Sequence, residues 1–399
     1  MYRFYCRFYQ FIMRIAARFI PFQEPEIIEG SGRLSQVVPY LKNQNLNRLL
    51  IVTDQGMIAT HLLEPLLQQL HTERIDYFLF DQTTPNPTID TIEDALGLYH
   101  SKRCEALLAF GGGSPIDCAK AIAARVANQQ KTLPQMKGLF KVGKSGIPPF
   151  IAIPTTAGTG SEATLAAVIT NATTSEKYAL MDPALTPKLA VLDPLLTVGL
   201  PKPLTAATGM DALTHVIEAY IGKSTTRTTR SLCLESIQLI FRYLHCAYQD
   251  GSDLEARAGM QKAAYLAGKA FSRSYVGNIH AVAHTLGGYY GTPHGIANAI
   301  ILPSILREYG STIIKPLSEL ADAAGITERS MNQREKAQRL IEAIEKLNKD
   351  MQIPSKTKVL EKDIQAMAKR AYSEANPLYP VPVIFSKKQF QDIYYRIKA

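Results

Sequence analysis

Short apolar runs alternate with amphipathic stretches from about residue 26 to residue 200. Three of these runs are typical of buried parallel strands, namely Leu49–Thr53, Ala106–Phe110 and Phe150–Ile153. The stretches that follow them carry helical spacing at Met57–Leu70, Thr88–Lys102 and Pro115–Asn128. This alternation of strand and helix predicts an open, doubly wound α/β sheet.

The pattern changes after Pro201, where apolar positions recur at helical spacing over much longer stretches. The predicted helices are 205–221, 229–248, 253–273, 296–308, 312–324 and 332–349. A proline-rich crossing at 376–382 then precedes a last short helix. We therefore expect an extension at 1–21, an α/β domain at 22–200 and an all-helical domain at 201–399, with the boundary near Gly199–Lys202.

The first twenty residues form a separate pattern. Four arginines stand at spacings of 4, 7 and 4, which places them on one narrow helical face: Arg3, Arg7, Arg14 and Arg18. Aromatic and aliphatic side chains cover most of the remaining surface. The pattern predicts a helix in weak contact with an anionic membrane surface, and the alternative is an extension that is disordered or packed on a partner. No run elsewhere is apolar and long enough to span a bilayer.

Composition narrows the class of protein. The chain has 399 residues, 46% of them hydrophobic and 20% charged, which is ordinary for a globular protein of two domains. Its formal charge of +9 includes the four early arginines, and the remaining excess is small and scattered, so we expect no nucleic-acid partner. The five cysteines form no CxxC pair, which favours a reducing compartment. We expect a cytoplasmic homodimer.

A glycine-rich turn follows the predicted strand 106–110. Gly111, Gly112, Gly113 and Ser114 lead into a helix with a proline in its first turn, where backbone N–H groups and the helix dipole favour a phosphate. A second loop, 154–162, also follows a strand and is rich in hydroxyl groups and glycine. Two such loops at the carboxyl ends of parallel strands predict a dinucleotide site. A tight turn without a ligand is the alternative.

Asp54 stands directly after the predicted strand 49–53. A carboxylate there can accept hydrogen bonds from an adenosine ribose and repels a 2′-phosphate, which favours NAD over NADP. By spacing alone, Asp54 could equally be a helix N-cap.

Four of the eight histidines fall in three short motifs between Gly209 and Asn298. Asp211 and His215 are four residues apart in a helical pattern, as are His280 and His284, and His294 follows a Thr-Pro step. One carboxylate with two or three imidazoles suits Fe²⁺ or Zn²⁺ with a coordination position left for substrate. Histidines satisfied within a helical core are the alternative, and spacing does not separate His280 from His284.

These motifs resemble those of the iron-dependent (group III) alcohol dehydrogenases, over about residues 22 to 399. The resemblance implies a dehydroquinate-synthase-like fold with a nucleotide-binding α/β domain and an all-helical metal domain. It implies metal ligands at Asp211, His215, His280 and His294, and proton handling by His284 near the nicotinamide. Nucleotide contacts are implied at Asp54, Asn86, Gly112, Gly113, Ser114, Thr155, Thr156 and Lys177. Only the extension departs from the family.

The expected activity is NAD-dependent, reversible oxidation of a primary alcohol to an aldehyde, with Fe²⁺ (or Zn²⁺) as the Lewis acid. One rival is a metal-dependent lyase or cyclase on the same fold. It would need basic residues beside the ligands, and Val216–Tyr220 and Leu286–Tyr290 contain none. The other rival is an NAD-binding scaffold without enzymatic activity, against which an intact ligand set argues.

Overall fold

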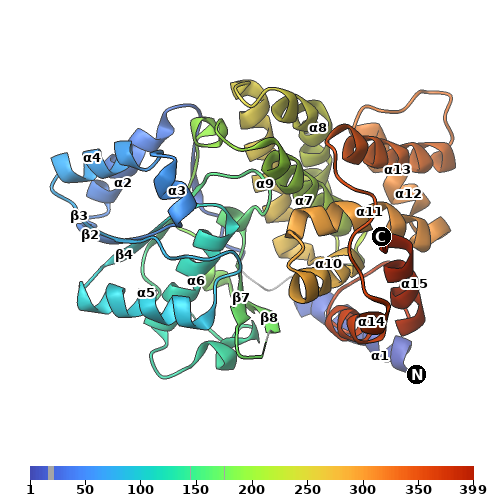
Figure 1. The fold of residues 1–399 in the computed structure, drawn as a ribbon, viewed down its shortest axis with the longest axis horizontal. Helices are drawn as coiled ribbons and strands as arrows, with labels where there is room; N and C mark the ends of the chain where they lie inside the picture. The colour runs from blue at the N-terminus through green and yellow to red at the C-terminus, as the bar shows by residue number, and fades with distance from the viewer. Residues whose placement is uncertain (17–21, 144, 175) are drawn as a thin grey trace. The chain divides into compact units, whose positions relative to one another are not determined.

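The computed structural model describes residues 1–16, 22–143, 145–174 and 176–399. The chain divides into two compact units, which we describe separately. One comprises Pro21–Leu200, and the other comprises Pro201–Ala399 together with Met1–Ile20 (Figure 1).

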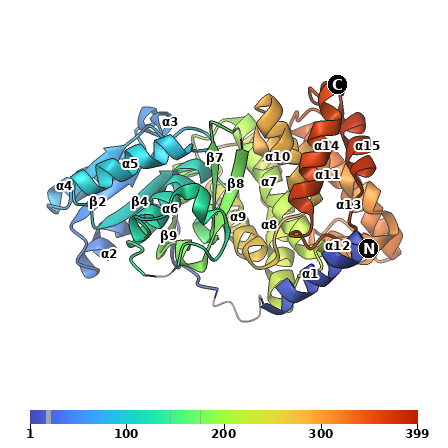
Figure 2. The same ribbon diagram turned by 90° about the horizontal axis from the view of Figure 1, so that it is seen from below.

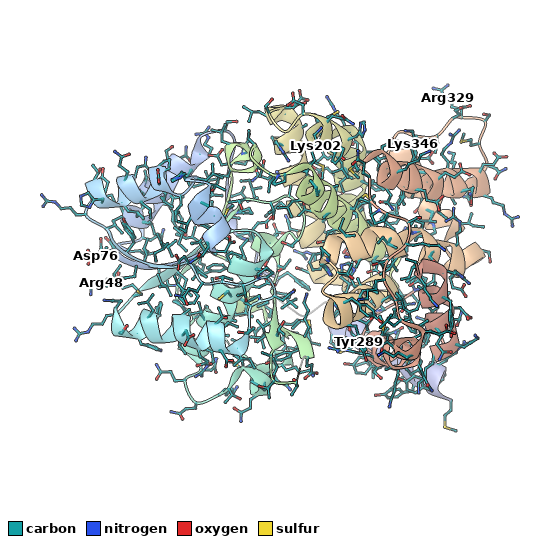
Figure 3. The ribbon with its side chains drawn as sticks, viewed as in Figure 1. Arg48, Asp76, Lys202, Tyr289, Arg329 and Lys346 are labelled. Atoms are coloured by element: carbon teal, nitrogen blue, oxygen red, sulfur yellow. The ribbon has the colours of Figure 1, made fainter. Side chains whose placement is uncertain are left out.

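A six-stranded parallel sheet forms the centre of the first unit, with strand order β1-β9-β6-β4-β2-β3. The strands are β1 (Glu26–Glu29), β2 (Arg48–Val52), β3 (Asp76–Phe80), β4 (Ala106–Gly111), β6 (Phe150–Pro154) and β9 (Leu189–Leu192). At the edge of the sheet Arg48 of β2 and Asp76 of β3 are register partners and form an exposed ion pair of 2.8 Å (Figure 3). Because β2 lies between β3 and β4, the chain reverses its direction of winding beside β2.

Helices cover both faces of this sheet. Leu49 and Ile51 of β2 point to one face and pack with α2 (Val37–Asn43) and α4 (Glu64–Thr72). The alternate residues of β2 point to the other face and pack with α5 (Ile89–Ser101) and α6 (Gly113–Ala127). This alternation follows from the two-residue period of a strand, and burial on both faces explains the continuous apolar runs.

The sequence prediction for this unit needs two corrections. The helix expected at 57–70 is two helices, α3 (Gln55–Ala59) and α4, because His61 adopts a left-handed conformation (φ 58°). A new helix then begins at Glu64, with Pro65 in its first turn. A second sheet was not predicted. It has the order β5-β8-β7 and contains β5 (Gly138–Leu139), β7 (Ala166–Asn171) and β8 (Glu176–Met181).

The second unit is helical between Lys202 and Ile397. Its main helices are α7 (Lys202–Ile221), α8 (Arg227–Gln249), α9 (Leu254–Ser274), α10 (Asn278–Tyr290), α11 (His294–Tyr309), α12 (Ile314–Ala323), α13 (Gln333–Asp350), α14 (Glu361–Ala375) and α15 (Lys387–Ile397). The predicted helices agree with these to within a few residues. Helices α10 and α14 are missing from the predicted ranges, although the spacing of His280 and His284 indicated a helical turn. The crossing at 376–382 is non-helical as expected.

The N-terminal extension forms helix α1 (Tyr2–Ala16), which packs on the helical unit (Figure 2). Cys6 and Gln10 are buried, and the Arg7 guanidinium donates hydrogen bonds to the carbonyl oxygens of Val381 and Pro382 at 2.7 and 2.8 Å. The expectation that the arginines form one outward face is therefore wrong for Arg7. Arg18 lies outside the described residues. Among the helices that are described, none could cross a membrane.

Candidate functional site

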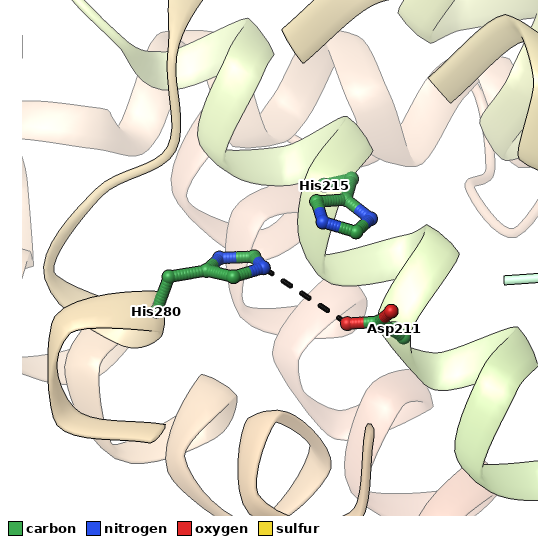
Figure 4. Close-up of side chains that lie close together, drawn as sticks. All are labelled: Asp211, His215 and His280. Carbon is green, nitrogen blue, oxygen red and sulfur yellow. Dashed lines mark ion pairs between the residues drawn. The ribbon is translucent and has the colours of Figure 1, made fainter. Parts of the chain in front are cut away.

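Asp211, His215 and His280 come together inside the helical unit (Figure 4). One ligand atom from each side chain lies within 4.8 Å of the others, and all three residues are buried. Helix α7 supplies Asp211 and His215 one turn apart, and α10 supplies His280, whose Nε2 is 3.9 Å from Asp211 Oδ1. The His215 ring stacks on Phe271 at a centroid distance of 4.2 Å, which fixes its plane.

His294, the first residue of α11, adds a third nitrogen as a fourth potential ligand atom. Its Nε2 is 3.4 Å from Asp211 Oδ1, although His294 is not part of the mutual group of three. Helix α11 approaches α7 closely because residue 295 is glycine. A Cβ there would lie 2.0 Å from the carbonyl oxygen of Ala207. The close approach places His294 beside Asp211.

The side-chain amide of Asn298 contacts three acceptor atoms of this cluster at once. Its Nδ2 donates to Asp211 Oδ1 at 2.7 Å and lies 3.3 and 3.2 Å from Nε2 of His280 and His294. Its buried Oδ1 has no hydrogen-bond partner in the described part of the chain. An electropositive amide group thus points at one carboxylate oxygen and two imidazole nitrogens, the donor set that Fe²⁺ and Zn²⁺ prefer. The residues present therefore fit a divalent metal ion.

Glu218 orients His280 and was not predicted from the sequence. Its carboxylate is buried and accepts hydrogen bonds from the backbone N–H groups of Gly277 (2.7 Å) and Ile279 (2.8 Å) and from His280 Nδ1 (2.6 Å). A proton held on Nδ1 leaves Nε2 as the acceptor that faces Asp211. The signal was present, since Glu218 is one turn beyond His215 on α7.

His284 lies next to the cluster, but it has a different partner. Its Nδ1 is 2.5 Å from Glu374 Oε1 on α14, and the same oxygen accepts a hydrogen bond of 3.0 Å from the Tyr379 hydroxyl. The His284 ring stacks on His294 at 5.2 Å between centroids. His284 is thus absent from the group of three potential ligands, and Glu374 holds it in one tautomer.

The two predicted loops meet in the α/β unit at the carboxyl ends of β4 and β6. The Thr155 N–H donates to the Gly111 carbonyl at 3.0 Å. At Gly113 a Cβ would lie 2.8 Å from Thr159 Cγ2, so the glycine permits this close contact between the loops. Helix α6 begins here with Gly112 as its N-cap, and its first N–H groups point out of the helix end.

Asp54 lies at the point where the sheet reverses its direction of winding. It caps α3, with Oδ1 accepting from the Met57 N–H at 2.9 Å, so the N-cap alternative is correct. Its other oxygen, Oδ2, would be 3.6 Å from a Cβ at Gly111, which places the carboxylate beside the glycine turn. Capping uses Oδ1 of Asp54, so the contact between Asp54 and an adenosine ribose stays a prediction.

Three more of the predicted nucleotide residues lie together. Lys177 Nζ donates to Asn86 Oδ1 at 2.6 Å, and the Asn86 N–H lies 3.4 Å from Ser114 Oγ. Asn86 has a φ of 58°, a left-handed conformation that asparagine tolerates better than most residues. Thr156 packs against Gly112, where a Cβ would be 3.3 Å from its Cγ2.

A buried lysine, which was not predicted from the sequence, holds the second loop through hydrogen bonds. Lys120 Nζ donates hydrogen bonds of 2.6 to 3.1 Å to the carbonyls of Ser161, Thr164 and Ala166 and to two hydroxyl groups. Asp117 accepts from Ser161 Oγ at 2.6 Å and thus braces the loop. Burial lowers the pKa of Lys120 to about 8 and raises that of Glu162 to about 7.

The raised pKa of Glu162 predicts a specific dependence of stability on pH. Its ordinary value is 4.5, so between about pH 4.5 and 7 the carboxyl is protonated in the folded chain and ionised in the unfolded chain. The free energy of unfolding should therefore fall as pH rises through this window, by about 1–3 kcal/mol. Glu162→Gln should remove this contribution. Urea denaturation of both proteins at pH 5 and pH 8 measures this contribution to the free energy of unfolding. If the two proteins differ in free energy of unfolding by the same amount at both pH values, the prediction is contradicted.

The fold and the two sites define a class of protein. The α/β unit carries a pair of loops of the kind that bind nucleotides, and the helical unit carries a cluster of one carboxylate and several imidazoles. This combination is typical of metal-dependent oxidoreductases with the dehydroquinate-synthase-like fold. The sequence model described as iron-containing alcohol dehydrogenase matches residues 24–194, and that of the family's C-terminal region matches residues 205–397. The chain belongs to the iron-containing alcohol dehydrogenase family.

Individual relatives agree with this. The chain is 38% identical to alcohol dehydrogenase 4 of Saccharomyces cerevisiae over 90% of this chain and 93% of that protein. It is 36% identical to the NAD-dependent methanol dehydrogenase of Bacillus methanolicus, over 89% and 93% of the two chains. The crystal structure of a 1,3-propanediol oxidoreductase superposes with a TM-score of 0.90 at 34% identity, covering 95% of this chain and all of that one.

Proposed function

We propose that this protein is an NAD- and metal-dependent dehydrogenase that interconverts a primary alcohol and its aldehyde. The observation that carries the proposal is the convergence of Asp211, His215 and His280. Family membership and the activities named for its relatives favour this class over a lyase, a cyclase or a scaffold.

Asp211, His215, His280 and His294 would hold the metal, which we take to be Fe²⁺, with Zn²⁺ as the alternative. When bound, such an ion supplies Lewis-acid stabilisation of a developing negative charge on the substrate oxygen. The residues of the chain then have separate roles. Glu218 keeps a proton on Nδ1 of His280, so that Nε2 presents a lone pair. Asn298 donates to Asp211 and holds that carboxylate in place.

We assign proton transfer to His284. Since Glu374 accepts the Nδ1 proton, the other ring nitrogen is the one that can take up a proton released by the alcohol. NAD supplies the hydride acceptor. We propose that its phosphates bind at Gly112, Gly113 and Ser114, with further contacts from Asn86, Thr155, Thr156 and Lys177. The loop pair and the N-terminus of α6 support this.

An activity assay tests the proposal. Protein purified without oxygen, supplied with Fe²⁺ or Zn²⁺ and NAD⁺, should form NADH with at least one member of a panel of short primary alcohols. Failure with every alcohol, together with failure to oxidise NADH with the matching aldehydes, would refute it.

Cofactor choice gives a second prediction. Replacement of Asp54 should relieve repulsion of a 2′-phosphate and remove ribose hydrogen bonds, which shifts the NAD/NADP preference by about tenfold to a hundredfold. Asp54→Asn keeps an oxygen that can cap α3, whereas Asp54→Gly does not. The kcat/KM ratio for the two cofactors should shift in both variants. If the ratio stays constant and only thermal stability falls in the glycine variant, Asp54 is a helix cap and nothing more.

We further propose a homodimer in the cytoplasm, in weak contact with membranes through residues 1–20. The five cysteines are free thiols, as a reducing compartment favours. The edge strands β1 and β3 offer backbone groups for pairing with a second copy. Light scattering of the purified protein measures the oligomeric state.

A further inference from the structure

Helix α1 packs with its polar side toward the protein. Gln10 is 6% exposed and donates hydrogen bonds to the carbonyl oxygens of Tyr379 (2.7 Å) and Pro377 (3.2 Å). Arg7 donates to the carbonyls of Val381 and Pro382 in the same segment, and Cys6 is enclosed with Val381 and Ile384. Surface helices usually bury their apolar face, so this orientation is the reverse of the normal one.

The apolar face of α1 is consequently exposed. Its members stand four, three, one and three residues apart and so form one continuous stripe on a helix. They are Phe4 (77% exposed), Phe8 (55%), Phe11 (57%), Ile12 (47%) and Ile15 (41%). Such a contiguous patch of large apolar side chains marks an interaction surface.

The charges beside the stripe indicate its partner. Arg3 and Arg14 are exposed on the same helix, and the sequence contains no acidic residue before Glu24. A second copy of α1 would bring these like charges together, which opposes pairing of two stripes. An anionic lipid surface instead attracts them while the phenylalanines enter the interface.

Resting on the membrane contact proposed above, we propose that the stripe of Phe4, Phe8, Phe11, Ile12 and Ile15 is its docking surface for an anionic membrane, with α1 lying in the plane of the interface. Arg7 and Gln10 anchor the helix to the protein, and Arg3 and Arg14 face the lipid headgroups. Arg7 is therefore not among the arginines that face the lipid. The protein stays folded when it binds the membrane.

Co-sedimentation of the full-length protein with vesicles tests this. Vesicles of phosphatidylcholine with about 30% phosphatidylserine should bind the protein at low salt, and binding should weaken in 0.5 M NaCl. The triple variant Phe4→Ser, Phe8→Ser, Phe11→Ser should lose at least about tenfold in partitioning. Because these side chains are exposed, the variant should keep its fold and alcohol-dependent NADH formation.

Two controls make the test specific. Phe140→Ser and Tyr395→Ser remove exposed aromatic side chains elsewhere and should leave vesicle binding unchanged. Arg3→Gln with Arg14→Gln should reduce the preference for phosphatidylserine. Absence of wild-type binding at low salt, or equal binding by the triple variant, would overturn the proposal. So would a fall in molecular mass of the triple variant in solution, since the stripe would then join two copies of the chain.

Discussion

The His215→Ala variant is expected to lose both its bound metal and its turnover while keeping its fold. His215 is buried beside Asp211 and His280, and loss of one of the four proposed ligands would remove a coordinate bond and open the site to water. The fall in metal affinity should exceed the roughly 10–100-fold that loss of an outer-shell partner costs. Elemental analysis of anaerobically purified protein and steady-state kcat measure the two effects.

A histidine outside the cluster provides the control for this experiment. His245 lies half-buried on α8, where it contacts Gln249, and His245→Ala should retain wild-type metal content and kcat. Because alanine leaves a gap beside Phe271, His215→Asn separates loss of packing from loss of the ligand. Full metal occupancy and full rate in His215→Ala would show that the assigned site is wrong.

His284→Ala should behave differently, with metal retained and kcat reduced. His284 is adjacent to the ligands but is paired with Glu374, so its loss removes a proton acceptor and leaves the metal-binding atoms in place. The fall in kcat should be about 10²- to 10⁴-fold. Glu374→Gln should produce a smaller fall in kcat, with KM little changed, because the imidazole remains without its orienting carboxylate.

Metal content decides this assignment. His284→Ala should keep the wild-type metal content, whereas His215→Ala should lose its metal. Equal loss of metal in His284→Ala and His215→Ala would mean that His284 is a ligand.

Much of the fold could be predicted because the α/β unit has strands buried on both faces. Such strands appear in the sequence as uninterrupted apolar runs, as β2, β4 and β6 do. Strands β1, β3 and β9 were not predicted, since β1 and β3 are edge strands with charged or half-exposed positions. The single helix expected at 57–70 is interrupted because the backbone at His61 turns left-handed, which periodicity does not reveal.

The site could be predicted as far as local spacing reaches. Asp211 with His215 and His280 with His284 are one-turn pairs, so their shared faces follow from the sequence. The sequence does not show which face of α10 points toward α7. Only the packing of these helices brings His280 toward Asp211 and leaves His284 to Glu374, which is distant in the chain. Asn298 and Glu218 were missed because they act through neighbouring ligands and match no motif of their own.

The chain keeps its two kinds of chemistry in separate stretches of sequence. The loops of the α/β unit all precede Leu200, and the carboxylate and imidazoles all follow Pro201. A single genetic crossover near codon 200 would thus exchange the proposed metal ligands between relatives and leave the proposed nucleotide loops unchanged. Helix α1 would then meet a foreign helical unit. The hydrogen bonds that Arg7 and Gln10 donate to the body of the protein end on backbone carbonyls, which any sequence supplies, so such chimaeras should still seat their N-terminal helix.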